Sequence, residues 1–333
     1  MTVIVTGATG YIAQHIIKEL LKENCNVIGT VRSESKGEYL SSLINSPYFT
    51  YAVVPNIIAE GAFDQLLTEN NDVDCFIHAA SPVDFQAKDI QNELLRPAIE
   101  GTKNVLHAIE KYGNVKNIIV TSSTAAVRDS SGNRDPEKWI NESTWNKITL
   151  EQGLVSARLG YDVAKTFAEK EVLKFADKNK GIFNITTVNP TFVFGPQAYE
   201  VKCKEKLNES AEIVNRVLKS NPADEIPLHV GRFIDVRDVA KAHVEAMKRP
   251  EEFDGKRLIL LHAGCTNELI ASIINKHFPN VNIPKGSLEK HEEQMKTGDM
   301  KWDNSETKAL LGFEFMCVED SNIETVKQIL DAK

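Results

Sequence analysis

Tyr161 and Lys165 stand four residues apart in a stretch with helical periodicity, and Ser123 follows an upstream run of β-branched residues. Residues at i and i+4 share one helix face, so the phenol and the ammonium can act on the same group. A phenol is a slow acid at neutral pH unless a neighbouring ammonium lowers its pKa. The spacing therefore favours acid–base chemistry by the phenol, with the serine hydroxyl as a second donor.

Reduction of a carbonyl is a reaction that needs this set of groups. It requires a hydride, an acid that protonates the developing alkoxide, and a second donor that holds the oxygen. We predict that Tyr161 is the proton donor and Ser123 the second donor. Lys165 is predicted to lower the pKa of the tyrosine and to hydrogen-bond the ribose of a nicotinamide cofactor.

Tyr112 and Lys116 have the same i, i+4 spacing as Tyr161 and Lys165, but they do not lie within one predicted helix. Gly113 and Asn114 interrupt the helix between them, so the two side chains are not expected to share a face, and Tyr112 is predicted to be structural.

Motifs for other chemistries are missing from the sequence. It has no G-x-S-x-G serine elbow, no H-E-x-x-H and no clustered Cys/His set, so no metal site is predicted. His78 is interpreted as a packed strand residue, and residues 291–293 as a solvated charged stretch. The cysteines form no C-x-x-C pair and are interpreted as small, buried or half-buried apolar residues in a reducing compartment: Cys25, Cys75, Cys203, Cys265 and Cys317.

A glycine-containing loop joins the first predicted strand to the first predicted helix. The glycines permit a tight turn and a close backbone approach to a pyrophosphate, and the helix N-terminus offers N–H groups to it. A G-x-x-G pattern alone also fits an ordinary turn, but its place at the first strand–helix junction favours dinucleotide binding. The loop residues predicted to bind the cofactor are Gly7, Thr9, Gly10, Tyr11 and Ile12.

The end of the second predicted strand indicates which dinucleotide is bound. NAD sites commonly place an acidic residue there to accept from the ribose hydroxyl. This chain has Arg32, with Lys36 one turn later, and cations suit a 2′-phosphate. Glu34 between them could neutralise Arg32, and the arginine could also be a solvated surface residue. We predict NADP(H) as the cofactor.

The elements that must position these residues alternate between short apolar strands and helices. Strands are expected at residues 3–6, 26–31, 51–54, 73–78, 115–121 and 182–188, with helices at 11–21, 89–112 and 157–178. Such alternation predicts an α/β fold with a Rossmann-type, doubly wound parallel sheet and a smaller, mixed C-terminal substrate lobe. The NADP-binding domain is placed at 1–190, with 230–262 returning to it, and the lobe at 191–229 and 263–333.

The composition and net charge of the chain indicate which classes of binding partner are disfavoured. The 333-residue chain has a net charge of -8, which disfavours nucleic acid or an anionic membrane as main partner. No signal peptide and no membrane-length apolar run is visible, so a cytoplasmic location is expected.

The sequence also resembles the extended short-chain dehydrogenases, in their dihydroflavonol-reductase-like group, along its whole length. The matching stretches include residues 7–16, 27–33, 78–82, 121–123, 189–197, 234–243 and 310–313. The resemblance implies the catalytic set Ser123, Tyr161 and Lys165. It further implies cofactor contacts by Asn56, Ile57, Ala79, Ser81, Pro190, Val193 and Ser210, and a substrate pocket walled by Val83, Phe85, Thr124 and Phe192.

Four positions depart from the pattern of these relatives. Asn56 stands where the group often has Asp, and Thr124 where it often has an aromatic residue. Arg128 and Arg158 replace apolar pocket residues, which implies a wider or more polar pocket.

The resemblance implies NADPH-dependent reduction of aldehydes and ketones, including 2-oxoaldehydes, in a methylglyoxal-reductase type of enzyme. Two alternatives stay open. A sugar-nucleotide epimerase or dehydratase would favour an acidic residue where Arg32 stands, and a non-catalytic dinucleotide-sensing regulator would commonly lack the Tyr161–Lys165 pair. The expected partner is a small carbonyl compound, and a homodimer is possible on the same resemblance.

Overall fold

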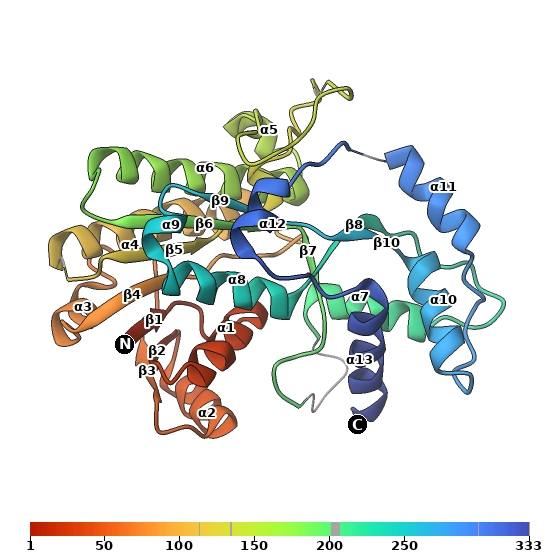
Figure 1. Ribbon diagram of the computed structural model, residues 1–333, viewed down its shortest axis with the longest axis horizontal. Helices are drawn as coiled ribbons and strands as arrows, with labels where there is room; N and C mark the ends of the chain where they lie inside the picture. The colour runs from red at the N-terminus through yellow and green to blue at the C-terminus, as the bar shows by residue number, and fades with distance from the viewer. Residues whose placement is uncertain (113, 134, 201–206, 299, 333) are drawn as a thin grey trace.

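The computed structural model describes residues 1–112, 114–133, 135–200, 207–298 and 300–332 (Figure 1). Within them, seven strands form one parallel sheet in the order β3-β2-β1-β4-β5-β6-β9. Order reverses beside β1, which is the switch point where ligands bind in such sheets. The strands are β1 Thr2–Val5, β2 Asn26–Val31, β3 Phe49–Val53, β4 Val73–His78, β5 Asn117–Thr121, β6 Asn184–Pro190 and β9 Arg257–Leu260.

Helices cover both faces of this sheet (Figure 1). Both faces of the sheet are apolar, because successive residues of β1 point to opposite faces. Val3 and Val5 belong to one apolar cluster and Ile4 to the other. The first cluster packs under α1 Tyr11–Lys22, α2 Glu34–Ile44, α8 Val236–Lys248 and α9 Pro250–Phe253. The second packs under α3 Asp64–Glu69, α4 Arg96–Tyr112 and α6 Ala157–Lys178.

A smaller mixed sheet stands beside the large one. In it β7 and β8 run parallel and β8 and β10 antiparallel. Figure 1 shows helices gathered around it at one end of the molecule. The elements are β7 Phe192–Phe194, β8 Val230–Asp235, β10 Ala263–Thr266, α7 Glu209–Leu218, α10 Asn267–His277, α11 Leu288–Gly298 and α13 Val318–Asp331.

The predicted fold class is confirmed. Boundaries shift in places, because the predicted helix at 89–112 divides into the π-helix η1 Gln91–Leu95 and α4. Short helices that the sequence analysis did not identify include α5 Leu150–Gly153, α12 Ser305–Leu311 and the 3₁₀ turn η2 Thr124–Ala126.

The division into two lobes at residue 190 stays a proposal. Within the segment 230–262, α8 and β9 support its return to the large sheet, whereas β8 at Val230–Asp235 pairs within the small sheet.

The cysteines follow the prediction with one exception. Cys25, Cys75 and Cys265 are buried, whereas Cys317 is exposed. The prediction is wrong for Cys317 because it stands at the N-cap of α13, where its Sγ accepts from the Asp320 N–H at 3.4 Å. Cys203 lies outside the described residues.

No helix in the described part of the chain is long and apolar enough to cross a membrane.

Candidate active site

The predicted phosphate loop lies at the switch point of the large sheet, between the ends of β1 and β4. Gly7 has φ +66, and a Cβ there would lie 3.0 Å from the Cα of Ala80, so glycine is required both by conformation and by space. Helix α1 begins at Tyr11, and its N-cap Gly10 provides no side-chain cap. The first backbone N–H groups of the helix are therefore free to bind an anion.

Thr6 ties the two strand ends together. Its Oγ1 accepts from the N–H groups of Ala79 and Ala80 at 3.1 and 3.0 Å and hydrogen-bonds His78 Nδ1 at 2.9 Å. His78 is buried, as predicted, and burial lowers its pKa to about 3, so the ring is neutral. The segment that carries Ala79 and Ser81 is thereby held against the phosphate loop.

A cleft of about 820 Å³ opens from this loop toward α6 and the smaller lobe. Its volume is in the range typical of small-molecule sites. Thirteen predicted site residues line it: Gly10, Tyr11, Ile12, Ala79, Ser81, Val83, Phe85, Ser123, Thr124, Tyr161, Phe192, Val193 and Ser210.

The remaining predicted site residues lie outside the cleft lining. Gly7 and Thr9 form the loop behind it, and Pro190 ends β6, where its carbonyl accepts from Thr124 Oγ1 at 3.4 Å. Asn56 is exposed and caps its own turn by accepting from the Ile58 N–H at 3.1 Å. Ile57 packs beside Gly101 of α4.

Arg32 directly after β2 and Lys36 in the first turn of α2 are both exposed, and the structure records no ion pair for either within the residues it describes. Glu34, the acid that could have neutralised Arg32, instead accepts a hydrogen bond from the Tyr51 hydroxyl at 2.5 Å. This bond raises the pKa of Tyr51 to about 12. Two cations are thus left available at the end of β2.

Helix α6 brings the predicted catalytic residues to the sheet edge. Ser156 caps its N-terminus by accepting from the Leu159 N–H. Lys165 is buried, and its Nζ donates to the carbonyl of Thr121, the last residue of β5, at 3.1 Å. Ser123 follows that strand, accepts from the Ala125 N–H at 3.1 Å and donates to the Pro190 carbonyl at 3.5 Å. Tyr161 and Ser123 both face the cleft.

The pKa of Tyr161 is shifted in the direction opposite to the prediction. Burial raises the pKa of Tyr161, and the neighbouring Ser123 hydroxyl only partly opposes this by favouring the phenolate. The expected lowering of the Tyr161 pKa by Lys165 is therefore wrong, because burial outweighs every opposing influence. Burial lowers the pKa of Lys165 itself to about 8, against an opposing effect of Glu169. The phenol is thus protonated at neutral pH.

A buried polar network behind Lys165 fixes α6 to the sheet. Glu169, one turn beyond Lys165, accepts from Arg257 Nε of β9 at 2.5 Å and from Asn189 Nδ2 of β6 at 2.7 Å. It also accepts from the Ser122 hydroxyl. Sequence reasoning missed this network, because a lone glutamate on a helix carries no motif.

The substrate side of the cleft is aromatic and cationic. The rings of Phe85 and Tyr161 meet edge to face at 5.5 Å between centroids. The Arg158 guanidinium lies 5.4 Å from the Phe85 centroid and 5.5 Å from that of Phe192. Arg128 pairs with Asp162 at 2.9 Å.

Three further lining residues come from the C-terminal part of the chain and were not predicted. Met295, Met300 and Trp302 close the far side of the cleft. No local pattern marks them, and the isolated bridge between Trp302 and Ile140 joins segments distant in sequence.

Residues excluded from the site on sequence grounds lie elsewhere. The Tyr112 hydroxyl donates to Asp64 at 2.9 Å at the end of α4. His291 Nδ1 hydrogen-bonds Thr266 Oγ1 at 2.9 Å in the smaller lobe. Among the residues that the structure describes, no group of three or more His, Cys, Asp or Glu side chains could hold a metal ion.

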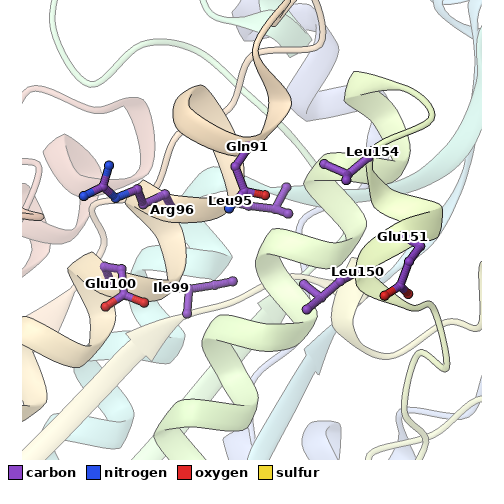
Figure 2. Close-up of a pocket in the computed structure, with 8 residues that line it drawn as sticks. All are labelled: Gln91, Leu95, Arg96, Ile99, Glu100, Leu150, Glu151 and Leu154. Atoms are coloured by element: carbon purple, nitrogen blue, oxygen red, sulfur yellow. The ribbon is translucent and has the colours of Figure 1, made fainter.

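A second, smaller pocket of about 240 Å³ lies between α4 and α5 (Figure 2). It contains none of the predicted site residues. Figure 2 shows the side chains of Gln91, Leu95, Arg96, Ile99, Glu100, Leu150, Glu151 and Leu154 around it.

Comparison with known proteins identifies the family of the chain. Residues 3–261 match the model of the NAD dependent epimerase/dehydratase family. The chain belongs to this family. The prediction of an extended short-chain dehydrogenase is confirmed, and the family match ends one residue after β9, before most of the smaller lobe.

Members of this family with high similarity align along nearly the whole chain. The NADPH-dependent methylglyoxal reductase of Saccharomyces cerevisiae is 40% identical and is covered to 98%, with 99% of this chain aligned. The crystal structure of Gre2 from Candida albicans with NADPH is 41% identical, with a TM-score of 0.93 and coverage of 100% of this chain and 99% of that one. Yeast methylglyoxal/isovaleraldehyde reductase with NADPH is 40% identical, with a TM-score of 0.92 and coverage of 99% and 98%.

Proposed function

We propose that the protein reduces aldehydes and ketones with NADPH. The observation that carries the proposal is that the Tyr161 phenol and the Ser123 hydroxyl face one cleft, which also reaches the phosphate loop. The names of the similar proteins, NADPH-dependent methylglyoxal reductase and methylglyoxal/isovaleraldehyde reductase, support the same reaction class.

The residues of this chain fit NADPH. Gly7 leaves room that a Cβ would fill, and the open N-terminus of α1 suits the pyrophosphate. Arg32 and Lys36 would hold the 2′-phosphate. Lys165 would hydrogen-bond the nicotinamide ribose, and the other predicted contacts are Thr9, Gly10, Tyr11, Ile12, Asn56, Ile57, Ala79, Ser81, Pro190, Val193 and Ser210.

When bound, NADPH supplies the hydride. The residues of the chain then orient the carbonyl and manage its proton. Ser123 donates to the carbonyl oxygen and holds it beside the phenol. Tyr161 protonates that oxygen as negative charge develops, and its raised pKa keeps the proton available at neutral pH. Val83, Phe85, Thr124 and Phe192 shape the remainder of the substrate pocket.

The test is consumption of NADPH, followed by its absorbance, with methylglyoxal and 3-methylbutanal as substrates. Turnover that requires both NADPH and the carbonyl compound is expected. Absence of turnover across a broad carbonyl panel would overturn the proposal and favour an epimerase, a dehydratase or a non-catalytic sensor.

We further propose a cytoplasmic enzyme that acts on small molecules without a nucleic-acid partner. The negative net charge of -8 supports the absence of a nucleic-acid partner. A homodimer stays a prediction, and light scattering of the purified protein measures it.

A further inference from the structure

Arg158 places a positive charge in the substrate cleft, next to the predicted proton donor. It lies one helical turn before Tyr161 on α6, and its side chain is exposed to the cleft. The guanidinium rests on the faces of Phe85 and Phe192, at 5.4 and 5.5 Å from their centroids. Phe85 in turn contacts the ring of Tyr161. The charge is therefore about one aromatic ring away from the reacting phenol.

Among the described residues, no acid forms an ion pair with Arg158, unlike with Arg128 nearby. Arg128 Nη2 contacts both carboxylate oxygens of Asp162, at 3.1 and 2.9 Å, and the Asp162 side chain is only 1% exposed. No ion pair or hydrogen bond of the Arg158 guanidinium is recorded within the described residues. Asp162 therefore contacts Arg128 and acts on Arg158 only electrostatically, from a distance.

The other acids among the described cleft residues do not pair with Arg158. Asp84 is exposed and accepts from the Gln86 N–H at 2.8 Å, and Glu209 is exposed at the start of α7. The surroundings disfavour the charged form of Arg158, because burial and then the repulsion of Arg128 lower its pKa. Both arginines favour the phenolate of Tyr161 and so act on the reaction centre. An anionic group on the substrate would relieve this excess of positive charge.

We propose that the enzyme prefers carbonyl substrates that carry a carboxylate, the oxo acids, and that Arg158 binds this carboxylate. Arg158 is a specificity-determining residue for the reaction proposed above, on which this inference rests. A guanidinium matches a carboxylate with two parallel hydrogen bonds, and the two phenylalanine rings hold it in place without competing as acceptors.

The proposed step balances as an ordinary carbonyl reduction. The hydride of NADPH forms the new C–H bond at the carbonyl carbon, and the carbonyl π electrons move to oxygen. That oxygen takes the proton of Tyr161, which solvent replaces. The products are a hydroxy acid and NADP⁺, and the carboxylate bound by Arg158 is unchanged.

The test compares each oxo acid with its own methyl ester, which removes the charge and keeps the carbonyl. Benzoylformate and 4-oxopentanoate, each with its ester, sample two distances between carboxylate and carbonyl. The ratio of kcat/KM for acid over ester is measured in the wild type and in Arg158→Gln, Arg158→Lys and Arg216→Gln. Arg216 is an exposed arginine of α7 outside the cleft and serves as the matched control.

We expect a ratio above one for at least one pair in the wild type. It should fall roughly tenfold or more in Arg158→Gln, in line with loss of a charge-assisted hydrogen bond. Arg158→Lys should retain part of the preference, and Arg216→Gln all of it. Added salt should weaken the acid preference and leave ester reduction unchanged.

A binding measurement separates this inference from the proposed function. Benzoate and its neutral analogue benzamide are titrated into the NADP⁺-loaded enzyme by calorimetry. Binding of benzoate that exceeds that of benzamide, and that disappears in Arg158→Gln, supports the carboxylate site. Ester reduction with no acid preference in any pair overturns the inference while the carbonyl-reductase function stands. If neither acid nor ester is reduced, the proposed carbonyl-reductase function is wrong. Equal binding of benzoate and benzamide overturns the inference of a carboxylate site.

Discussion

At the scale of single residues, the structure assigns the proton to Tyr161 at neutral pH. Burial of the phenol raises its pKa, and the guanidinium groups of Arg158 and Arg128 only partly oppose this. A protonated phenol suits reduction, in which the residue must give a proton rather than accept one. The protonation state of Tyr161 therefore suits the proposed reduction.

Tyr161→Phe is expected to lower kcat by about 100-fold or more, because it removes the acid and leaves the ring packed against Phe85. NADPH binding, measured by fluorescence titration, should persist. Tyr112→Phe is the matched control, since it also removes a tyrosine hydroxyl but only loses the bond to Asp64. Turnover of Tyr161→Phe near that of the wild type would contradict the assigned role.

Lys165 should set the alkaline limit of activity. Its pKa is lowered to about 8, so its ammonium is charged below that pH and neutral above it. We expect kcat/KM for reduction to decline as pH rises through about 8 and the cation that helps bind the cofactor is lost. Arginine stays charged throughout, so the residual activity of Lys165→Arg should not show this decline. The same alkaline decline in both proteins would refute the assignment.

Arg32 should decide between the two dinucleotides. Arg32→Asp replaces a partner of the 2′-phosphate by an acceptor for a ribose hydroxyl, so KM for NADPH should rise far more than KM for NADH. Glu34 does not compete for Arg32, because it is bound by Tyr51. Steady-state kinetics with both cofactors measure the ratio, and an unchanged ratio would show that the 2′-phosphate binds elsewhere.

At the scale of elements, α6 carries both the chemistry and its own anchor. Tyr161, Lys165 and Glu169 recur at intervals of four, so one helix face presents the phenol to the cleft, the ammonium to β5 and the carboxylate to β6 and β9. The position of the proton donor is therefore coupled to the buried pair of Glu169 and Arg257.

Glu169→Ala is expected to destabilise the protein by about 3–5 kcal/mol, because it leaves the guanidinium of Arg257 buried without its partner. Glu171→Ala on the same helix removes only a surface pair with Lys174 and should cost about 1 kcal/mol or less. Urea unfolding of both variants gives the comparison. Equal stability of the two would show that the buried pair does not anchor α6.

At the scale of the whole molecule, the cleft depends on segments from both ends of the chain. The phosphate loop comes from the first residues, whereas Met295, Met300 and Trp302 come from the last part. The family match stops at residue 261, but Leu311 and Phe315 pack in the same cluster as the buried residues of α1 and α8. The C-terminal part is thus integral to the fold as well as to the pocket.

A chain shortened to residues 1–261 is expected to lose cooperative folding, although it retains the entire matched region. Truncation removes α10 and α13 and so exposes the buried apolar face of β8, and it also deletes Leu311 from the main cluster. Near-UV circular dichroism and thermal unfolding measure the effect. A sharp unfolding transition in the shortened chain would show that residues 1–261 fold alone.

The features that could be predicted from the sequence are those that depend on neighbours along the chain. Gly7 and Gly10 specify a turn, the spacing of Tyr161 and Lys165 specifies a shared helix face, and alternation of strands and helices specifies the sheet. These are local or periodic properties, because backbone conformation and side-chain direction repeat with fixed periods. The cation that follows β2, Arg32, is also visible in the sequence.

The three-dimensional fold was needed to show which distant residues meet and how burial changes their charge. It joined Glu169 to Arg257, placed Trp302 in the cleft and gave Arg158 no ion pair within the part of the chain that the structure describes. It also reversed the expected direction of the Tyr161 pKa, because desolvation depends on every atom packed around a group and not on its position in the chain. Such contacts join parts of the chain far apart in sequence, and no period along it encodes them.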